Sequence, residues 1–175
     1  MIRLAVTAAL LLAGVAAAQQ RAQPRASAPR PAQQEIGRFG DWIAYVTEEN
    51  GQKICYMGVK AKSSAPRLPG RTDVVLSVTH RPGSRDQVAM LAGYAYPSGA
   101  EVAVTVDGST TLPFYTGGRA AFARDGRAAV AAFRRGNEAT VKGPPPRGPG
   151  QITDSFSLMG FTAAYEAIGK ACPAR

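Results

Sequence analysis

The chain has 175 residues, with 21 Lys and Arg against 12 Asp and Glu, a formal net charge of +9, two cysteines and one histidine. A single histidine excludes a metal site with two His ligands and makes Ser-His-Asp catalysis depend on one position. The excess of positive charge favours anionic partners such as lipid or polysaccharide surfaces.

The first eighteen residues, MIRLAVTAALLLAGVAAA, have the pattern of a secretory signal peptide. Arg3 supplies a positive charge, and the apolar run at residues 4–15 is too short to span a membrane as a helix. We expect cleavage after Ala18 and a mature protein in the periplasm, the outer envelope or the medium, with no transmembrane segment. A retained membrane anchor is the alternative. Such a compartment permits disulfides and leaves nucleic acids and nucleotide cofactors outside the expected partners.

Residues 19–34 contain only Gln, Arg, Ala, Pro and Ser. Because no aromatic or β-branched side chain is available to bury, the segment is predicted to be a disordered linker. Arg21, Arg25 and Arg30 are candidate contacts to an anionic surface, but their wide separation favours a solvated spacer. Residues 35–175 are long enough for one domain with its own core.

Short apolar runs separated by turn residues predict a mostly β domain, a sandwich or barrel rather than parallel βαβ units. Asn50-Gly51 is a pair typical of two-residue hairpins. At residues 101–106, valines alternate with Glu, Ala and Thr, which predicts one buried face. The predicted strands are at residues 42–46, 53–59, 74–79, 87–96, 101–106, 110–115, 119–123, 140–141 and 153–158.

A short helix is predicted at residues 127–135, with Asp125 as its N-cap and Gly136 closing it. The pair Arg134-Arg135 falls in the last predicted turn, where cations complement the helix dipole. We prefer this interpretation of the pair to a binding role.

A loop and a second helix complete the predicted domain. Residues 142–150 are rich in Pro and Gly, and only 25 residues follow them, so they are interpreted as a surface loop rather than a domain boundary. Gly160 ends the preceding strand. Apolar residues then recur at helical spacing, which predicts an amphipathic helix over residues 161–170.

Cys55 and Cys172 form an even pair in a compartment that is predicted to be oxidising. One lies in an early predicted strand and the other at the end of the last predicted helix, so we expect a disulfide between them. An unpaired or redox-active pair is the alternative, although no CxxC motif is present.

Residues able to carry catalysis do not form a known motif. His80 has serines and aspartates near it in the sequence, but no nucleophile elbow is present, and we interpret it as a surface residue at a strand end. Glu48 and Glu49 are interpreted as solvated turn residues. Residues 116–119 lack the Lys-Ser/Thr of a phosphate loop and are interpreted as a hairpin turn. We predict no catalytic, cofactor-binding or metal-binding residue.

Several segments resemble the invasion-associated locus B family of Gram-negative bacteria. They are Gly40-Asp41-Trp42, the small-residue segment 125–135, Thr140-Val141 and, above all, the closing FSLMGFTAAY at 156–165. The sequence departs from the family pattern at Tyr45, where a cysteine is usual. The resemblance implies an immunoglobulin-like β-sandwich exported to the periplasm or outer envelope, in a family named for a role in host-cell entry.

Together these features predict a non-enzymatic binding or accessory protein of the periplasm or outer envelope. Its expected partner is an envelope protein or an anionic glycan or lipid surface, and no cofactor is expected. Two other functions stay open, a periplasmic hydrolase with an unrecognised site and an assembly or chaperone-like factor. A deep pocket with convergent polar groups would favour the hydrolase.

Overall fold

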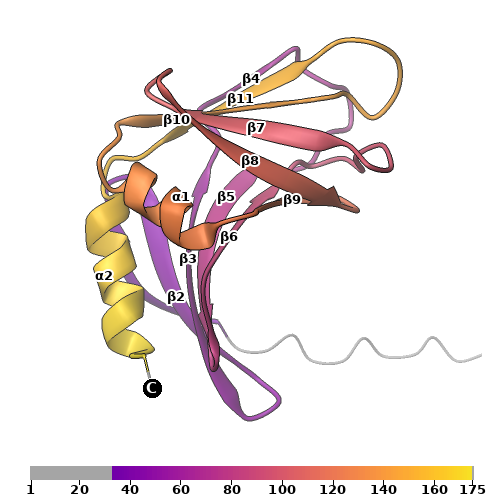
Figure 1. Ribbon diagram of the computed structural model, residues 1–175. Coiled ribbons are helices and arrows are strands. Elements are labelled where there is room, and N and C mark those ends of the chain that lie inside the picture. The colour runs from indigo at the N-terminus through magenta and orange to yellow at the C-terminus, as the bar shows by residue number, and fades with distance from the viewer. Residues whose placement is uncertain (1–32, 175) are drawn as a thin grey trace, which may run out of the picture. The chain divides into compact units, whose positions relative to one another are not determined.

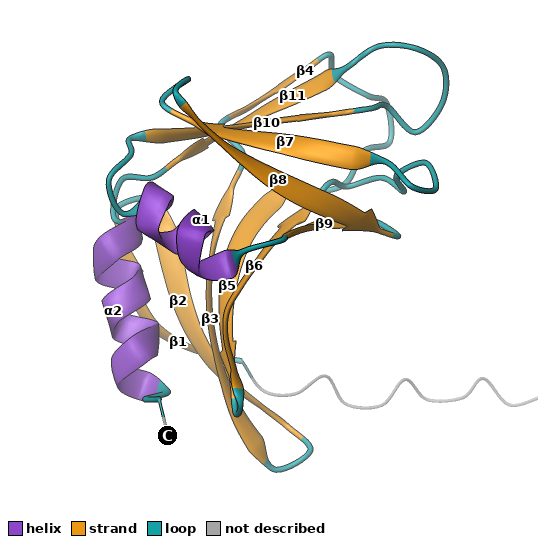
Figure 2. Cartoon of the chain, viewed as in Figure 1, coloured by secondary structure: helices purple, strands orange, loops and turns teal. Residues whose placement is uncertain are grey.

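The computed structural model describes residues 33–174, and the predicted signal peptide and nearly all of the predicted linker lie outside the described residues. Eleven strands and two helices form in this part of the chain (Figures 1 and 2). The mostly β fold with a short internal helix and a C-terminal helix, predicted from the sequence, is confirmed. The elements are β1 (Gln34–Phe39), β2 (Trp42–Glu49), β3 (Gln52–Lys60), β4 (Ser63–Ala65), β5 (Val75–Arg81), β6 (Ser84–Leu91), β7 (Glu101–Val106), β8 (Thr110–Gly117), β9 (Ala120–Ala123), α1 (Gly126–Phe133), β10 (Glu138–Gly143), β11 (Ile152–Ser157) and α2 (Phe161–Ala171).

The strands of the described residues form one antiparallel sheet in the order β1-β2-β3-β5-β6-β9-β8-β7-β10-β11-β4. β9 pairs with β6 on one side and with β8 on the other, so it joins two halves of the sheet. Figure 1 shows the half with β7, β8, β10 and β11 running across one end of the half with β2, β3, β5 and β6. Both halves contribute side chains to one core.

Alternate residues of each strand form the inner face of this sheet. Val102, Val104 and Val106 are 2%, 0% and 5% exposed, as the alternation in the sequence predicts. Val104 lies opposite Leu112 on β8 and opposite Val141 on β10. The buried row therefore continues through the neighbouring strands, and each such side chain contributes about 1.5–3 kcal/mol by leaving water.

The C-terminal helix α2 packs against β1, β2 and β3 through buried Phe161, Ala164 and Ile168. The rings of Trp42 and Phe161 meet edge to face with centroids 5.0 Å apart. The Trp42 indole N–H donates a hydrogen bond to the Ser157 carbonyl oxygen at 3.0 Å, which satisfies its polar atom inside the core. Figure 2 shows α1 and α2 next to each other on the same side of the sheet.

Two glycines allow the β1–β2 turn to lie directly against the β11–α2 turn. Gly40 has a φ of 57°, and a Cβ atom there would lie 2.6 Å from the Met159 carbonyl oxygen. Gly160 has a φ of 89°, and its Cβ atom would collide with the Phe39 carbonyl oxygen. The Asp41 N–H donates to the Met159 carbonyl at 3.3 Å across the same contact. Only glycine fits both the backbone conformation and the space.

We expect Gly160→Ala to lower the free energy of unfolding by about 2–4 kcal/mol, because it adds a backbone clash to a left-handed conformation. Gly148→Ala is the matched control, since Gly148 also has a positive φ, 75°, but a Cβ atom there would meet open space. The free energy of unfolding of this control is expected to fall by only about 1 kcal/mol. Urea unfolding measures the free energy of unfolding of both variants. Equal losses would show that the two turns can move apart at little cost.

The first helix agrees with the sequence at its start and differs at its end. Asp125 is the N-cap, as predicted, and its carboxylate accepts the Ala128 N–H at 3.0 Å. The helix ends at Phe133, so the prediction that Arg134 and Arg135 lie in its last turn is wrong. The Arg135 N–H bonds to the Ala132 carbonyl, a tighter three-residue turn that closes the helix early.

The hairpin predicted at Asn50-Gly51 is confirmed, with φ values of 52° and 75° at these residues. The strand predicted over residues 87–96 is wrong beyond Leu91, where β6 ends. Gly93 has a φ of 75° and packs directly on the Thr72 backbone, which turns the chain out of the sheet although the residues around it are apolar. Strands β1 and β4 have no counterpart in the predicted elements.

Candidate functional site

Cys55 and Cys172 form the predicted disulfide, with their Cα atoms 5.9 Å apart. Cys55 is fully buried on β3, and Cys172 follows the last residue of α2. The Arg85 guanidinium donates to the carbonyl oxygen of Cys172 and so holds the same end of the helix. The disulfide thus fixes the end of α2 to the central strand β3.

The interpretation of His80 as a surface residue is wrong, because its exposed fraction is 0%. It follows Leu76 and Val78 at a spacing of two, so the strand turns all three side chains to the inner face. In the register His80 lies opposite Cys55, and its ring meets Tyr165 of α2 edge to face at 5.3 Å. The alternation of Leu76, Val78 and His80 was a signal for this burial.

A chain of polar contacts connects His80 to α2. Its Nδ1 accepts the Asp86 N–H at 3.3 Å, and the Tyr165 hydroxyl donates to the Asp86 carboxylate at 2.7 Å. The Nε2 atom has no hydrogen-bond partner among the described residues. Burial raises the pKa of Tyr165, and its hydrogen bond to Asp86 raises it further. The imidazole is buried, and these contacts join β5, β6 and α2.

Burial lowers the pKa of His80 below its ordinary value of 6.5, and the charge of Arg85 lowers it further against the opposing effect of Asp86. The unfolded chain therefore binds a proton at a higher pH than the folded protein does. The part of the unfolding free energy that depends on a neutral His80 is fully present above pH 6.5. It is lost as the pH falls through the pKa of His80 in the folded state.

We expect the urea midpoint of the protein to fall between pH 7.5 and pH 5 by more than that of His80→Gln, whose side chain does not titrate. At pH 7.5 the free energy of unfolding of His80→Gln is expected to be about 1–3 kcal/mol lower than that of the parent, because core packing and polar burial change. Parallel loss of stability in both proteins over this pH range would contradict the assignment.

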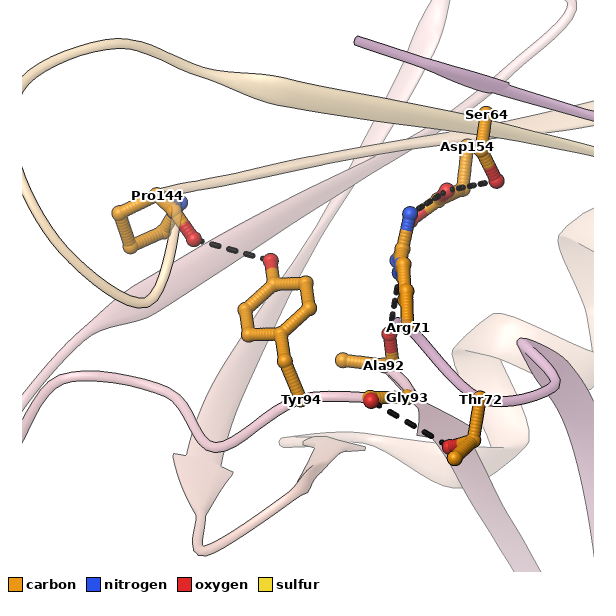
Figure 3. A network of polar contacts seen from close by, with 8 residues as sticks. All are labelled: Ser64, Arg71, Thr72, Ala92, Gly93, Tyr94, Pro144 and Asp154. Carbon is orange, nitrogen blue, oxygen red and sulfur yellow. Dashed lines mark hydrogen bonds and ion pairs between the residues drawn. The ribbon is translucent and has the colours of Figure 1, made fainter. Parts of the chain in front are cut away.

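A second polar cluster centres on an ion pair between Arg71 and Asp154, whose side chains are 6% and 3% exposed. Figure 3 shows the guanidinium pointing at the carboxylate. The two hydrogen bonds are 2.8 Å and 2.7 Å long, and Ser64 Oγ adds a third to the carboxylate at 2.6 Å. The Arg71 Nε–H donates to the Ala92 carbonyl at 2.6 Å. Asp154 lies on the inner face of β11, so this bidentate pair satisfies a charge that would otherwise be costly to bury.

Tyr94 extends the cluster from the segment that follows β6. Its ring lies under the Arg71 guanidinium at 5.0 Å, and its hydroxyl donates to the Pro144 carbonyl at 2.9 Å (Figure 3). Burial raises the pKa values of Tyr94 and Tyr96. Arg71 and Asp154 are 83 positions apart, and nothing in the sequence indicates that they pair.

An open depression of about 500 Å³ lies between α1 and α2. We call it the interhelical groove. Its charged rim includes three arginines, and the Arg134 guanidinium lies over the Tyr165 ring at 5.6 Å and 3.4 Å from the Glu166 carboxylate. The lining residues are Asp86, Arg127, Val130, Ala131, Arg134, Arg135, Thr162 and Tyr165. No binding role is predicted for any of them from the sequence.

The candidate anionic contacts Arg21, Arg25 and Arg30 lie outside the described residues. Among residues 33–174, no group of three or more His, Cys, Asp and Glu side chains is placed to hold a metal ion. In the same range no helix is long and apolar enough to cross a membrane.

Comparison with known proteins gives a consistent result. The model of a family described as invasion associated locus B (IalB) protein matches residues 42–169. The crystal structure of invasion associated protein B from Bartonella henselae is 18% identical, with a TM-score of 0.57, over 80% of this chain and 96% of that one. At this identity the similarity demonstrates a shared fold. No curated protein matches the chain.

Proposed function

The chain belongs to the invasion associated locus B family, and from this premise we propose that it is exported and acts as a non-enzymatic binding or accessory protein of the periplasm or outer envelope. The family name and that of the Bartonella protein refer to invasion. We therefore include contact with a host cell, besides a role within the envelope itself, among the settings of the proposed function.

One observation carries the proposal: the most deeply buried ionisable side chains, Arg71, Asp154 and His80, are held by contacts inside the core. Arg71 and Asp154 neutralise each other in the core. His80 is sealed from solvent, with Asp86 and Tyr165 bonded beside it. Arg71, Asp154 and His80 are buried away from a bound substrate and are not placed to move a proton on it. The disulfide supports export, since stable disulfides form in oxidising compartments.

Export predicts a defined mature protein. We expect the intact mass of protein from the periplasmic or extracellular fraction to correspond to a chain that begins at Gln19 and carries one disulfide. Alkylation under denaturing conditions should find no free thiol before reduction. Protein that keeps residues 1–18 in a cytoplasmic fraction, or that alkylates at both cysteines without reduction, would contradict the proposed location.

A non-enzymatic role predicts that chemically inert substitutions leave function intact. His80→Gln removes the histidine on which acid-base catalysis would depend. Expressed at the abundance of the parent, it should restore the envelope properties of a deletion strain as the parent does, because its loss is one of stability alone. Failure to complement at matched abundance, with a folded protein by circular dichroism, would instead favour the hydrolase.

A further inference from the structure

The interhelical groove has a regular arrangement of side chains on each wall. Arg127 and Ala131, four residues apart, share one face of α1, and Arg134 follows directly after the end of the helix. Thr162 and Tyr165, three residues apart on α2, line the other wall. Val130 and Ala131 supply apolar surface between the charged rims. The two helices thus form a channel with cations along one side.

The charges of the groove are not balanced. Arg134 pairs with Glu166, and the Asp86 carboxylate accepts the Tyr165 hydroxyl. Among the described residues, Arg127 and Arg135 have no ion-pair partner, and both are exposed. Two cations are therefore available to a ligand that enters the groove.

Helix stability does not explain Arg127. Arg127 is the second residue of α1, directly after Gly126, and a positive charge in the first turn is unfavourable to the helix dipole. Arg135 lies beyond the end of the helix. A cation at Arg135, just past the C-terminal end, still complements the dipole, so the lack of such a benefit is specific to Arg127.

The geometry distinguishes among anionic ligands. The Tyr165 ring stacks on Phe161 at 6.1 Å and carries the Arg134 guanidinium, so its faces are not free to stack on a sugar. A concave groove also does not match the plane of a bilayer. Arg127 and Arg135, near the two ends of α1, are eight residues apart, about 12 Å along a helix axis, which is about the distance between side chains four residues apart on one face of an extended peptide.

We propose, on the basis of the proposed binding function, that the interhelical groove binds an extended acidic segment of a partner protein. Two carboxylates four residues apart, on one face of the extended segment, contact Arg127 and Arg135, and the residues between them lie over Ala131. Arginine suits this role because its planar guanidinium binds a carboxylate with two parallel hydrogen bonds.

Fluorescence anisotropy with the mature protein tests the proposal. The probes are labelled hexapeptides with two Asp four residues apart and the same peptides with Asn in their place. We expect the Asp peptides to bind and the Asn peptides to bind about tenfold or more weakly, with affinity falling as salt rises. Arg127→Gln/Arg135→Gln should lose about tenfold in affinity, since each partly exposed charge contact contributes a few-fold.

Lys142→Gln/Arg147→Gln is the matched control, because it removes the same charge from exposed positions on β10 and the loop that follows. Its affinity should change less than about twofold, as exposed charges that do not touch the ligand act only through screened fields. Equal losses in the two double variants would overturn the assignment to the groove. Binding to anionic vesicles or heparin without binding to the Asp peptides would overturn the choice of an acidic peptide.

A second measurement separates binding from structure. Arg127→Gln should melt at the same temperature as the parent or higher, since it removes a cation from the first turn of a helix. A clear loss of stability would show that Arg127 serves the fold and would overturn its role in binding. Because the peptides are added to purified protein, failure of this binding leaves the export and complementation results of the proposed function intact.

Discussion

Removal of the Cys55–Cys172 disulfide is expected to lower the free energy of unfolding by about 4–5 kcal/mol, from the chain entropy of the loop that it closes. The bond spans 117 positions, so it restrains most of the domain in the unfolded state. A domain of this size has a total stability of about 5–15 kcal/mol. The reduced protein should therefore be marginally folded.

Urea unfolding of the oxidised protein, the reduced protein and Cys55→Ala/Cys172→Ala measures this effect. Reduction and substitution should agree to within the cost of the small cavity that the double variant leaves at buried Cys55. Hydrogen exchange should show the largest local loss of protection at the end of α2, which the bond fixes to β3. A loss below about 1 kcal/mol would mean that the unfolded chain is already restrained near these residues.

Asp154→Ala is expected to cost about 3–5 kcal/mol, because it leaves the buried Arg71 guanidinium without its counter-charge. Ser64 loses its acceptor at the same time. The loss should appear as a lower urea midpoint, and the segment that carries Arg71 should exchange its amide protons faster.

Arg71→Met/Asp154→Leu removes both charges and is compared with Asp154→Ala, which removes only one. Since both charges leave together, the double variant should recover most of the loss, and apolar replacement of a buried pair is often neutral or stabilising. A double variant as unstable as Asp154→Ala would show that the cluster contributes through its neutral contacts, such as the Arg71 bond to the Ala92 carbonyl.

Local patterns in the sequence predicted local structure well. The Asn50-Gly51 hairpin, the valine alternation at residues 101–106 and the Asp125 cap each depend on residues close together in the chain. Predictions failed where a distant contact decided the conformation. The strand beyond Leu91 ends because Gly93 packs on the Thr72 backbone, and no pattern within residues 87–96 contains that neighbour.

The candidate site could be predicted only in part. The disulfide followed from parity and the expected compartment, without any knowledge of distance. The prediction that His80 is a surface residue is wrong, although its spacing from Leu76 and Val78 indicates the inner face, because a polar side chain near a strand end is compatible with either face until the elements packed on it are known. The interhelical groove needs the mutual position of two helices that are separated by β10 and β11, which sequence spacing does not contain.

By itself, the sequence determined the strand class, the two helices and the family, because each depends on residue type at short spacing or on a recurrent motif, and it determined the cysteine pair through an even count. Gly40 and Gly160 belong to that motif, but only the tertiary structure shows that they allow two turns to touch. It alone also decided the order of the strands, the burial of His80 and the pairing of Arg71 with Asp154. The physical reason is that burial and charge pairing depend on which distant surfaces meet, and many arrangements of the same elements satisfy the same local preferences.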